Sequence, residues 1–161
     1  FIASKQVGAA GKVIGVDMTK EMISRAKENS RQLGISNVEF LLGEIEHLPL
    51  PPDSVDRIIS NCVLNLVPDK ITAFTEMFRV LKPGGSFCIS DVVTNGTIPD
   101  DLKQDSVLWA CCVAGAVERQ EYLRLLKATG FTSVLVAAER EYPHKASDKF
   151  TLFSMTITGN K

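Results

Sequence analysis

The chain has 161 residues, of which 45% are hydrophobic and 23% are charged, and its formal net charge is −1. This length suits one domain with a substantial core, and the small net charge gives no electrostatic reason to expect nucleic acid or an anionic membrane as a partner. No apolar run reaches the length of a membrane span, and no stretch resembles a signal peptide.

The first predicted elements are a strand, a helix and two further strands. Residues 12–17 form a short apolar run that ends in an acid, a pattern typical of buried parallel strands. Thr19 is placed to cap the helix that follows, and Gly34 is placed to end it. Two more apolar runs predict strands over 38–42 and 55–61.

Helices and strands continue to alternate in the second half of the chain. Pro68 suits the first turn of a helix, and apolar residues over 71–81 keep a helical period. Lys82-Pro83-Gly84-Gly85 ends this helix and turns the chain into a strand over 86–93. The remaining segments are predicted as helices over 99–113 and 118–129 and as antiparallel strands over 134–139 and 150–158, joined by residues 142–149.

This alternation predicts an α/β fold with a doubly wound sheet and right-handed crossovers, in one domain over residues 1–161. In such sheets, ligands bind outside the carboxyl ends of the strands. That rule places four polar side chains on one rim of the sheet: Asp17, Glu44, Asn61 and Asp91. Asp91 has the alternative role of capping a turn at Thr94-Asn95.

Three of these positions suggest a nucleoside site. Asp17 can accept hydrogen bonds from both hydroxyls of a ribose, or it can merely cap the next helix. Glu44 and Ile45 lie where a backbone N–H and an apolar side chain can meet an adenine ring, and a solvated loop acid is the alternative for Glu44. Asn61 can bind the cofactor or hold its own loop.

The four cysteines are too few, and their neighbours too apolar, for a disulfide scaffold, so a reducing cytosol is the expected compartment. Cys62 directly follows a strand end, whereas Cys88 is interpreted as a small packing residue. Cys111 and Cys112 fall in a predicted helix, where adjacent side chains point about 100° apart, so they are not expected to face one ligand. Neither His47 nor His144 has the spacing of a metal site.

Several segments resemble class I methyltransferases, which depend on S-adenosylmethionine. The widespread ones contain Asp17-Met18, Glu44-Ile45 and Lys82-Pro83-Gly84-Gly85. Two more specific segments, 60–66 and 108–116, resemble the arsenite methyltransferase family. The resemblance runs over essentially the whole chain.

The resemblance implies that S-adenosylmethionine is the cofactor, held by Asp17, Met18, Glu44, Ile45 and Asn61. It also implies that Cys62 and Cys112 are catalytic residues that bind arsenic, and soft thiolates do suit such a soft centre. The implied substrates are arsenite and methylarsenite, with a thiol reductant such as glutathione or thioredoxin. The complete protein is expected to be a monomer that acts in arsenic detoxification.

The chain departs from the class at its beginning. Class I methyltransferases start with a strand and a glycine-rich turn, and neither precedes Phe1. The chain is therefore expected to be truncated at the N-terminus, without the first strand and the glycine-rich loop. We expect it to bind the cofactor weakly or not at all, and an unpaired sheet edge makes it able to self-associate.

Three other functions stay open. A methyltransferase for a small organic acceptor would make Cys62 and Cys112 packing residues. A methyltransferase-like domain can also serve as a non-catalytic binding module. An NAD-dependent oxidoreductase would use Asp17 in the same way, but the run from Asn61 to Leu66 offers no apparatus for hydride transfer.

Overall fold

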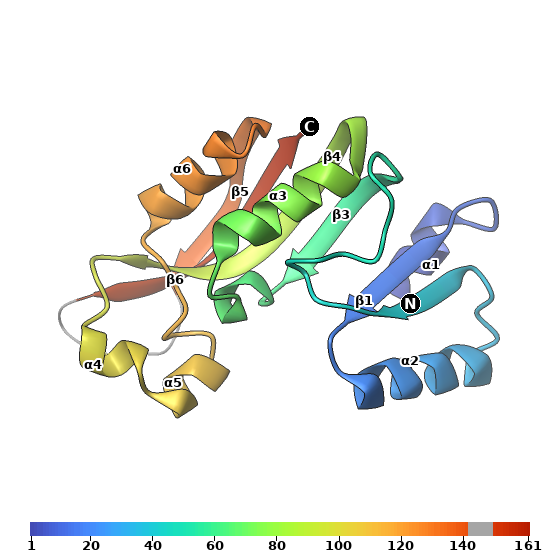
Figure 1. The fold of residues 1–161 in the computed structure, drawn as a ribbon, viewed down its shortest axis with the longest axis horizontal. Helices are drawn as coiled ribbons and strands as arrows, with labels where there is room; N and C mark the ends of the chain where they lie inside the picture. The colour runs from blue at the N-terminus through green and yellow to red at the C-terminus, as the bar shows by residue number, and fades with distance from the viewer. Residues whose placement is uncertain (142–149) are drawn as a thin grey trace. The chain divides into compact units, whose positions relative to one another are not determined.

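Two parallel strands and two helices make up the first of two compact units, residues 1–50. They are α1 (Ile2–Val7), β1 (Val13–Asp17), α2 (Lys20–Gln32) and β2 (Val38–Leu42) (Figure 1). The computed structural model describes residues 1–141 and 150–161, so the predicted connection over 142–149 lies outside the described residues. The two strands pair from Val13 with Val38 to Asp17 with Leu42, which confirms both of them as predicted.

The ends of α2 differ in one respect from the prediction. Thr19 is the N-cap residue, but its side chain makes no capping hydrogen bond. Asp17 instead fixes the turn that leads into the helix, because its Oδ1 accepts the backbone N–H of Thr19 at 2.8 Å. At the other end, Gly34 has a φ of 64°. The N–H groups of Gly34 and Ile35 donate to the carbonyls of Arg31 and Ser30, which is the Schellman pattern with glycine at its left-handed position.

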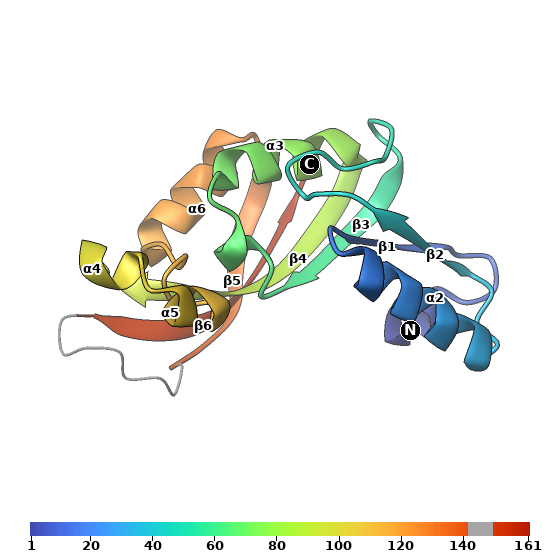
Figure 2. The ribbon, with the colours of Figure 1, turned by 60° about the horizontal axis from the view of Figure 1, so that its bottom comes forward.

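The second unit, residues 51–161, is built on a four-stranded sheet in the order β3-β4-β6-β5. β3 and β4 are parallel, and the other two pairs are antiparallel, as predicted for the last two strands. Figures 1 and 2 show α3 and α6 packed together against this sheet. The elements are β3 (Val55–Asn61), the 3-10 turn η1 (Leu64–Leu66), α3 (Lys70–Val80), β4 (Leu81–Asn95), α4 (Asp100–Lys103), α5 (Ser106–Ala110), α6 (Arg119–Ala128), β5 (Thr132–Glu141) and β6 (Thr151–Asn160).

The core of this unit lies between the sheet and the two helices. Phe74 of α3 and Tyr122 of α6 are fully buried, with their rings 5.3 Å apart in an edge-to-face arrangement. Ile89 and Met155, from the central strands β4 and β6, are equally buried. Packing against α3 and α6 thereby holds the central strand β4 in place on the face of the sheet that these helices cover.

One predicted helix is wrong. Residues 99–113 form two short helices, α4 and α5, instead of a single long one. The cause is Asp105, whose Oδ1 accepts the backbone N–H groups of Val107 and Leu108 and so starts a new helix. Cys111 and Cys112 consequently lie after the last residue of α5, outside any helix.

The predicted α/β class is confirmed, and backbone pairing is divided between two sheets. β1 and β3 each pair with a single strand among the described residues. β4 begins at Leu81, earlier than predicted, and the predicted turn persists inside it as a register shift next to Gly84, whose φ is 77°. In the described parts of the chain, no helix has the length and apolar character needed to cross a bilayer.

Candidate functional site

The backbone places Cys62 one residue beyond the end of β3. Its N–H donates to the carbonyl of Ser90 at 2.8 Å and so continues the parallel pairing of β3 with β4. The residue has a φ of 54°, a left-handed conformation that is uncommon for side chains other than glycine, asparagine and aspartate. The chain turns sharply here and presents the half-buried thiol at the carboxyl end of the strand.

Cys112 occupies the left-handed position of a Schellman motif that ends α5. Its N–H donates to the carbonyl of Trp109, and the N–H of Val113 donates to the carbonyl of Leu108, at 3.0 and 2.9 Å. Leu108 packs against the buried hydrophobic cluster that contains Val113. The φ of Cys112 is 62°, close to the 64° of Gly34 at the same position of α2. A cysteine thus stands where helices usually place glycine.

This geometry corrects the predicted arrangement of Cys111 and Cys112. The two do not follow each other on a helix, because Cys111 is the C-cap residue and Cys112 has a left-handed backbone. Cys111 is exposed, whereas Cys112 is half-buried.

The structure brings the thiols of Cys62 and Cys112 together. The Sγ of Cys112 lies 3.7 Å from the carbonyl oxygen of Cys62, within hydrogen-bond reach for sulfur. Burial raises the pKa of the Cys62 thiol, as does the negative charge of Asp91, whereas a hydrogen bond with the Cys112 thiol lowers it. Burial also raises the pKa of Cys112, followed by the charges of Cys62 and Asp91. Both thiols therefore keep their protons at neutral pH.

The loop after β3 that carries Cys62 and the loop after α5 that carries Cys112 are the two thiol-bearing loops. The buried side chain of Asn65 holds them in place as a clamp. Asn65, which is fully buried, accepts the N–H of Val92 at 3.0 Å and donates its own amide to the carbonyl of Val92. Gly115 lies against the backbone of Asn65, so closely that a Cβ there would come within 1.8 Å of the Asn65 carbonyl oxygen. Sequence reasoning missed both residues as individuals, although they belong to the two segments that carry the family resemblance. The Trp109 ring also lies beside Gly115.

Asp91 lies beneath these loops in β4 and is 1% exposed. Tyr122 donates its hydroxyl to Oδ2 of Asp91 at 2.7 Å, whereas Oδ1 has no hydrogen-bond partner among the described residues. Burial raises the pKa of Asp91 to about 6, against the opposing effects of the Tyr122 hydroxyl, the buried Lys70 ammonium and the nearby N–H groups of Cys62 and Val63. The alternative role as a cap for Thr94-Asn95 is wrong, because the carboxylate is directed to α6.

Four of the five residues predicted to hold a nucleoside lie in the first unit. Asp17 and Glu44 flank the carboxyl ends of β1 and β2, where Gly43 donates its N–H to the carbonyl of Asp17 at 3.1 Å. Next to them, Met18 is 72% exposed and Ile45 is half-buried. Asn61, the fifth residue, belongs to the second unit and is exposed at the end of β3.

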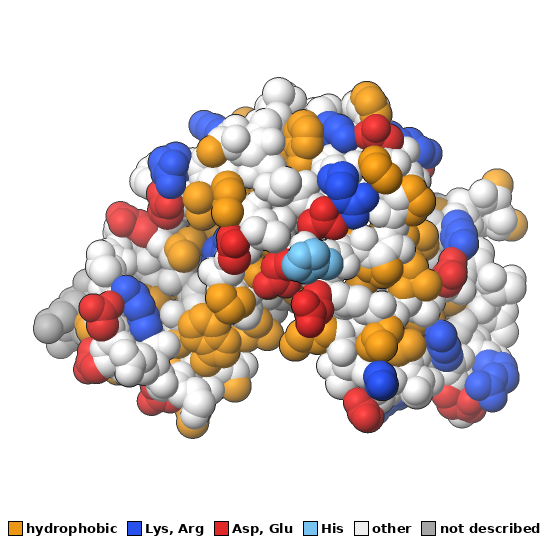
Figure 3. All heavy atoms as spheres, in the orientation of Figure 1, with side chains coloured by type: hydrophobic (Ala, Val, Ile, Leu, Met, Phe, Trp, Pro, Cys, Tyr) orange, Lys and Arg blue, Asp and Glu red, His pale blue; other side chains and the backbone are white. Residues whose placement is uncertain are grey.

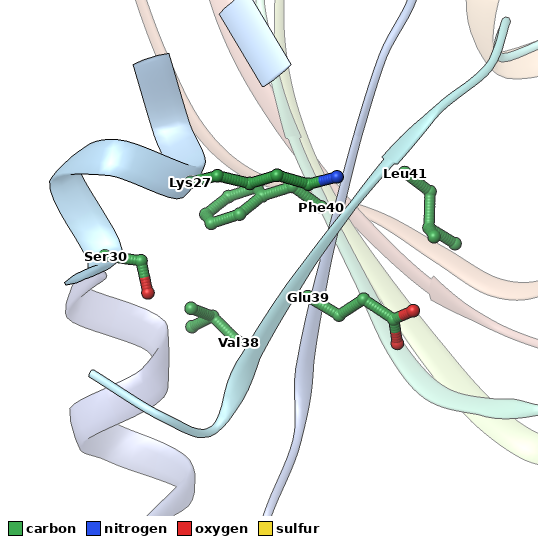
Figure 4. A pocket seen from close by; sticks show the side chains of 6 residues that line it. All are labelled: Lys27, Ser30, Val38, Glu39, Phe40 and Leu41. Atoms are coloured by element: carbon green, nitrogen blue, oxygen red, sulfur yellow. The ribbon is translucent and has the colours of Figure 1, made fainter. Parts of the chain in front are cut away.

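Other candidate groups do not form a site. His47 donates its backbone N–H to the Glu44 carbonyl within a turn, and His144 lies outside the described residues. The described residues hold no cluster of three or more possible metal ligands. A shallow hollow beside α2 and β2 has Lys27 lying along the Phe40 ring and shares no residue with the predicted nucleoside site (Figure 4). Its lining is Lys27, Ser30, Val38, Glu39, Phe40 and Leu41.

Apolar side chains are exposed on both thiol-bearing loops. Val63 and Leu66 follow Cys62 and are 43% and 38% exposed, and Val107 of α5 is 68% exposed. Figure 3 shows hydrophobic side chains gathered over α5. Around the thiols the surface is thus suited to a small ligand that is weakly hydrated.

Comparison with known proteins shows which family the chain resembles. The arsenite methyltransferase of Halobacterium salinarum is 47% identical over 148 residues, which are 92% of this chain but only 38% of that protein. A demethylmenaquinone methyltransferase of Oceanobacillus iheyensis is 42% identical over 82 residues, 51% of this chain and 34% of that protein. The crystal structure of an arsenic(III) S-adenosylmethionine methyltransferase from Chlamydomonas reinhardtii superimposes with a TM-score of 0.89, at 35% identity, over 99% of this chain and 58% of that one.

The chain thus spans well under half the length of the curated relatives it matches. A sequence model of the family described as "Methyltransferase domain" matches residues 1–130, which is most of the chain. The chain therefore belongs to the methyltransferase domain family.

Proposed function

We propose that the protein carrying this chain transfers a methyl group from S-adenosylmethionine to trivalent arsenic bound by Cys62 and Cys112. The observation that carries the proposal is the contact of the Cys112 thiol with the backbone carbonyl of Cys62, both residues having left-handed backbones just past the end of an element. Strained backbone of this kind is retained where function requires it. The similarity to arsenite methyltransferases over 92% of the chain supports the same substrate.

Two neutral thiols suit the capture of arsenous acid, As(OH)3. Each thiol sulfur forms a bond to arsenic, each displaced hydroxide takes the thiol proton, and two waters leave. Because the thiols are protonated at neutral pH, they supply those protons themselves. Arsenic keeps its lone pair, which is the nucleophile for a methyl group, so this chemistry needs no general base.

The residues of the first unit fit the nucleoside part of the cofactor. The Asp17 carboxylate uses Oδ1 for the Thr19 N–H and keeps its second oxygen for a ribose hydroxyl. The exposed Met18 side chain offers an apolar surface for a ring, and Glu44, Ile45 and Asn61 complete the proposed set. When bound, S-adenosylmethionine supplies an electrophilic methyl group. Arsenite, methylarsenite and a thiol reductant such as glutathione or thioredoxin are the proposed small-molecule partners.

The test is titration of the chain with phenylarsine oxide, a trivalent arsenical that requires two neighbouring thiols for tight binding. We expect one equivalent to bind tightly, and Cys62→Gly and Cys112→Gly each to weaken binding at least about tenfold. Glycine accepts the left-handed backbone, so these variants remove the thiol side chain without adding backbone strain. Cys111→Ser is the matched control and should bind as the unchanged chain does.

The competing function, methylation of a small organic acceptor, gains some support from the similarity to demethylmenaquinone methyltransferase over 51% of the chain. It gives the two thiols only a packing role. Unchanged phenylarsine oxide binding in both glycine variants would therefore refute the arsenic proposal and favour the organic acceptor.

A further inference from the structure

One buried acid has no part in the proposed reaction. Asp91 is 1% exposed, and its Oδ1 has no hydrogen-bond partner among the described residues. Burial of a carboxylate that is only partly hydrogen-bonded is costly, so such a group calls for an explanation. Tyr122 accounts for Oδ2 alone.

The position of Asp91 in β4 ties it to the thiols. Its neighbour Ser90 accepts the N–H of Cys62, and its other neighbour, Val92, is bonded through its backbone to Asn65. Asp91 thus lies directly under the loop that begins at Cys62. Its negative charge acts on the thiols of both Cys62 and Cys112.

A buried cation also acts on Asp91. The Lys70 ammonium is buried, donates to the carbonyl of Val67 at 2.9 Å and acts on the Asp91 carboxylate. Asp91 is the carboxylate whose charge raises the pKa of both thiols. It therefore contributes a negative potential at the pair of thiols formed by Cys62 and Cys112, whose flanking segments expose apolar side chains.

We infer that Asp91 is a specificity-determining residue, whose buried carboxylate makes the dithiol favour neutral or cationic thiophilic ligands over anionic ones. Within the proposed function, on which this reading of the substrate rests, the thiols should bind the uncharged acid As(OH)3 in preference to an anionic trivalent arsenical. A carboxylate beneath the sulfur atoms also stabilises the positive charge that arsenic gains when its lone pair bonds to a methyl group.

The potential can be measured at each sulfur with charged thiol reagents. We would compare the rates of modification by cationic 2-(trimethylammonium)ethyl methanethiosulfonate and anionic 2-sulfonatoethyl methanethiosulfonate, at about pH 8, where Asp91 is ionised. Mass spectrometry follows Cys62 in the unchanged chain, Cys112 in Cys111→Ser, and the exposed Cys111 in Cys112→Gly as the reference thiol. We expect the cation-to-anion rate ratio to be higher at Cys62 and Cys112 than at Cys111.

Asp91→Asn should lower this ratio at both thiols by about threefold to tenfold, because a unit charge is removed at short range. Asp91→Glu, which keeps the charge, should retain much of the ratio, and Tyr122→Phe should leave it high. An unchanged ratio in a folded Asp91→Asn would overturn the inference. Should that variant not fold, equal ratios at Cys62, Cys112 and Cys111 in the parent background would overturn it as well.

The result of this experiment on Asp91 can be distinguished from the result of the test of the proposed function. A charge-dependent ratio without tight binding of phenylarsine oxide would leave Asp91 as a selector for another neutral or cationic ligand and would remove arsenic as the substrate. Tight binding of phenylarsine oxide with a ratio independent of Asp91 would keep arsenic and remove the role of Asp91.

Discussion

The Sγ of Cys112 lies 3.7 Å from the carbonyl oxygen of Cys62, and both residues have left-handed backbones, with φ values of 62° and 54°. The two loops that carry them are about 50 residues apart in the sequence. Both cysteines therefore carry backbone strain, and glycine at either position would relieve it. Strained residues of this kind cluster at functional sites, which supports the proposed role of both sulfur atoms.

The first prediction follows from the helix end at Cys112. Cys112→Gly should raise the free energy of unfolding by about 0.5–1 kcal/mol, because glycine adopts the left-handed position without a steric cost. Cys112→Ala removes the same sulfur but keeps the strain and should give no gain. Urea unfolding followed by circular dichroism measures both. Gly34→Ala is the reciprocal control and should lose about 1 kcal/mol, and equal stabilities of the glycine and alanine variants at 112 would contradict the argument.

The second prediction concerns the amide clamp. Asn65→Ala leaves the N–H and carbonyl of Val92 buried without partners and should cost about 2–4 kcal/mol in unfolding free energy. Asn65→Asp keeps the acceptor for the Val92 N–H and should cost less. Both should weaken phenylarsine oxide binding in the molecules that remain folded. The exposed Asn29→Ala serves as the control, and an equal loss in that variant would show that Asn65 has no special role.

The third prediction concerns the steric effect of adding a side chain at Gly115. Gly115→Ala places a Cβ 1.8 Å from the Asn65 carbonyl oxygen, so one of the two loops has to move. We expect a loss of at least about 2 kcal/mol in unfolding free energy together with weaker arsenical binding. Gly84→Ala tests the alternative that any glycine loss is damaging. At Gly84 an added Cβ meets open space, and only its φ of 77° is unfavourable.

The fourth prediction is a pH dependence of stability caused by Asp91. Burial raises its folded-state pKa to about 6, above the ordinary value near 4, so the folded state binds this proton more tightly than the unfolded state does. The resulting stabilisation is complete below about pH 4 and is lost as the pH rises through about 6, a change of about 3 kcal/mol. The difference in unfolding free energy between Asp91→Asn and the unchanged chain should therefore shift by this amount in favour of the asparagine variant between about pH 4 and pH 7. The exposed Asp101→Asn should show no such shift, and a flat difference for Asp91→Asn would contradict the prediction.

A fifth prediction separates the two roles of Asp17. Asp17→Asn keeps an acceptor for the Thr19 N–H but loses the charge offered to a ribose, so S-adenosylmethionine affinity should fall about tenfold while the stability of α2 is preserved. Thr19→Ala should change neither property, because that side chain makes no capping bond. Calorimetric titration in the protein that carries this chain measures the affinity. Loss of affinity in Thr19→Ala alone would reverse the assignment.

The sequence reveals the strands well and the thiol geometry poorly. β1, β2 and β3 are short apolar runs between clear turn signals, so their bounds follow from composition alone. The two helices at 99–113 were missed because the apolar period continues across Asp105, whose capping bonds override it. Whether Cys112 is helical or left-handed depends on where α5 stops, and the unpaired oxygen of Asp91 depends on the packing of α6 onto β4. Neither has a local sequence signal.

Residues 90–94 of β4 give both thiol loops one common support. Ser90 and Val92 hold the Cys62 loop through three hydrogen bonds, and Thr94 donates its N–H to the carbonyl of Val117, just past the Cys112 loop. Since successive residues of a strand advance by about 3.4 Å, these anchor points are spaced by the backbone itself. The loops of Cys62 and Cys112 are consequently tethered to one extended segment, so a change in the course of β4 over these residues would act on both loops together.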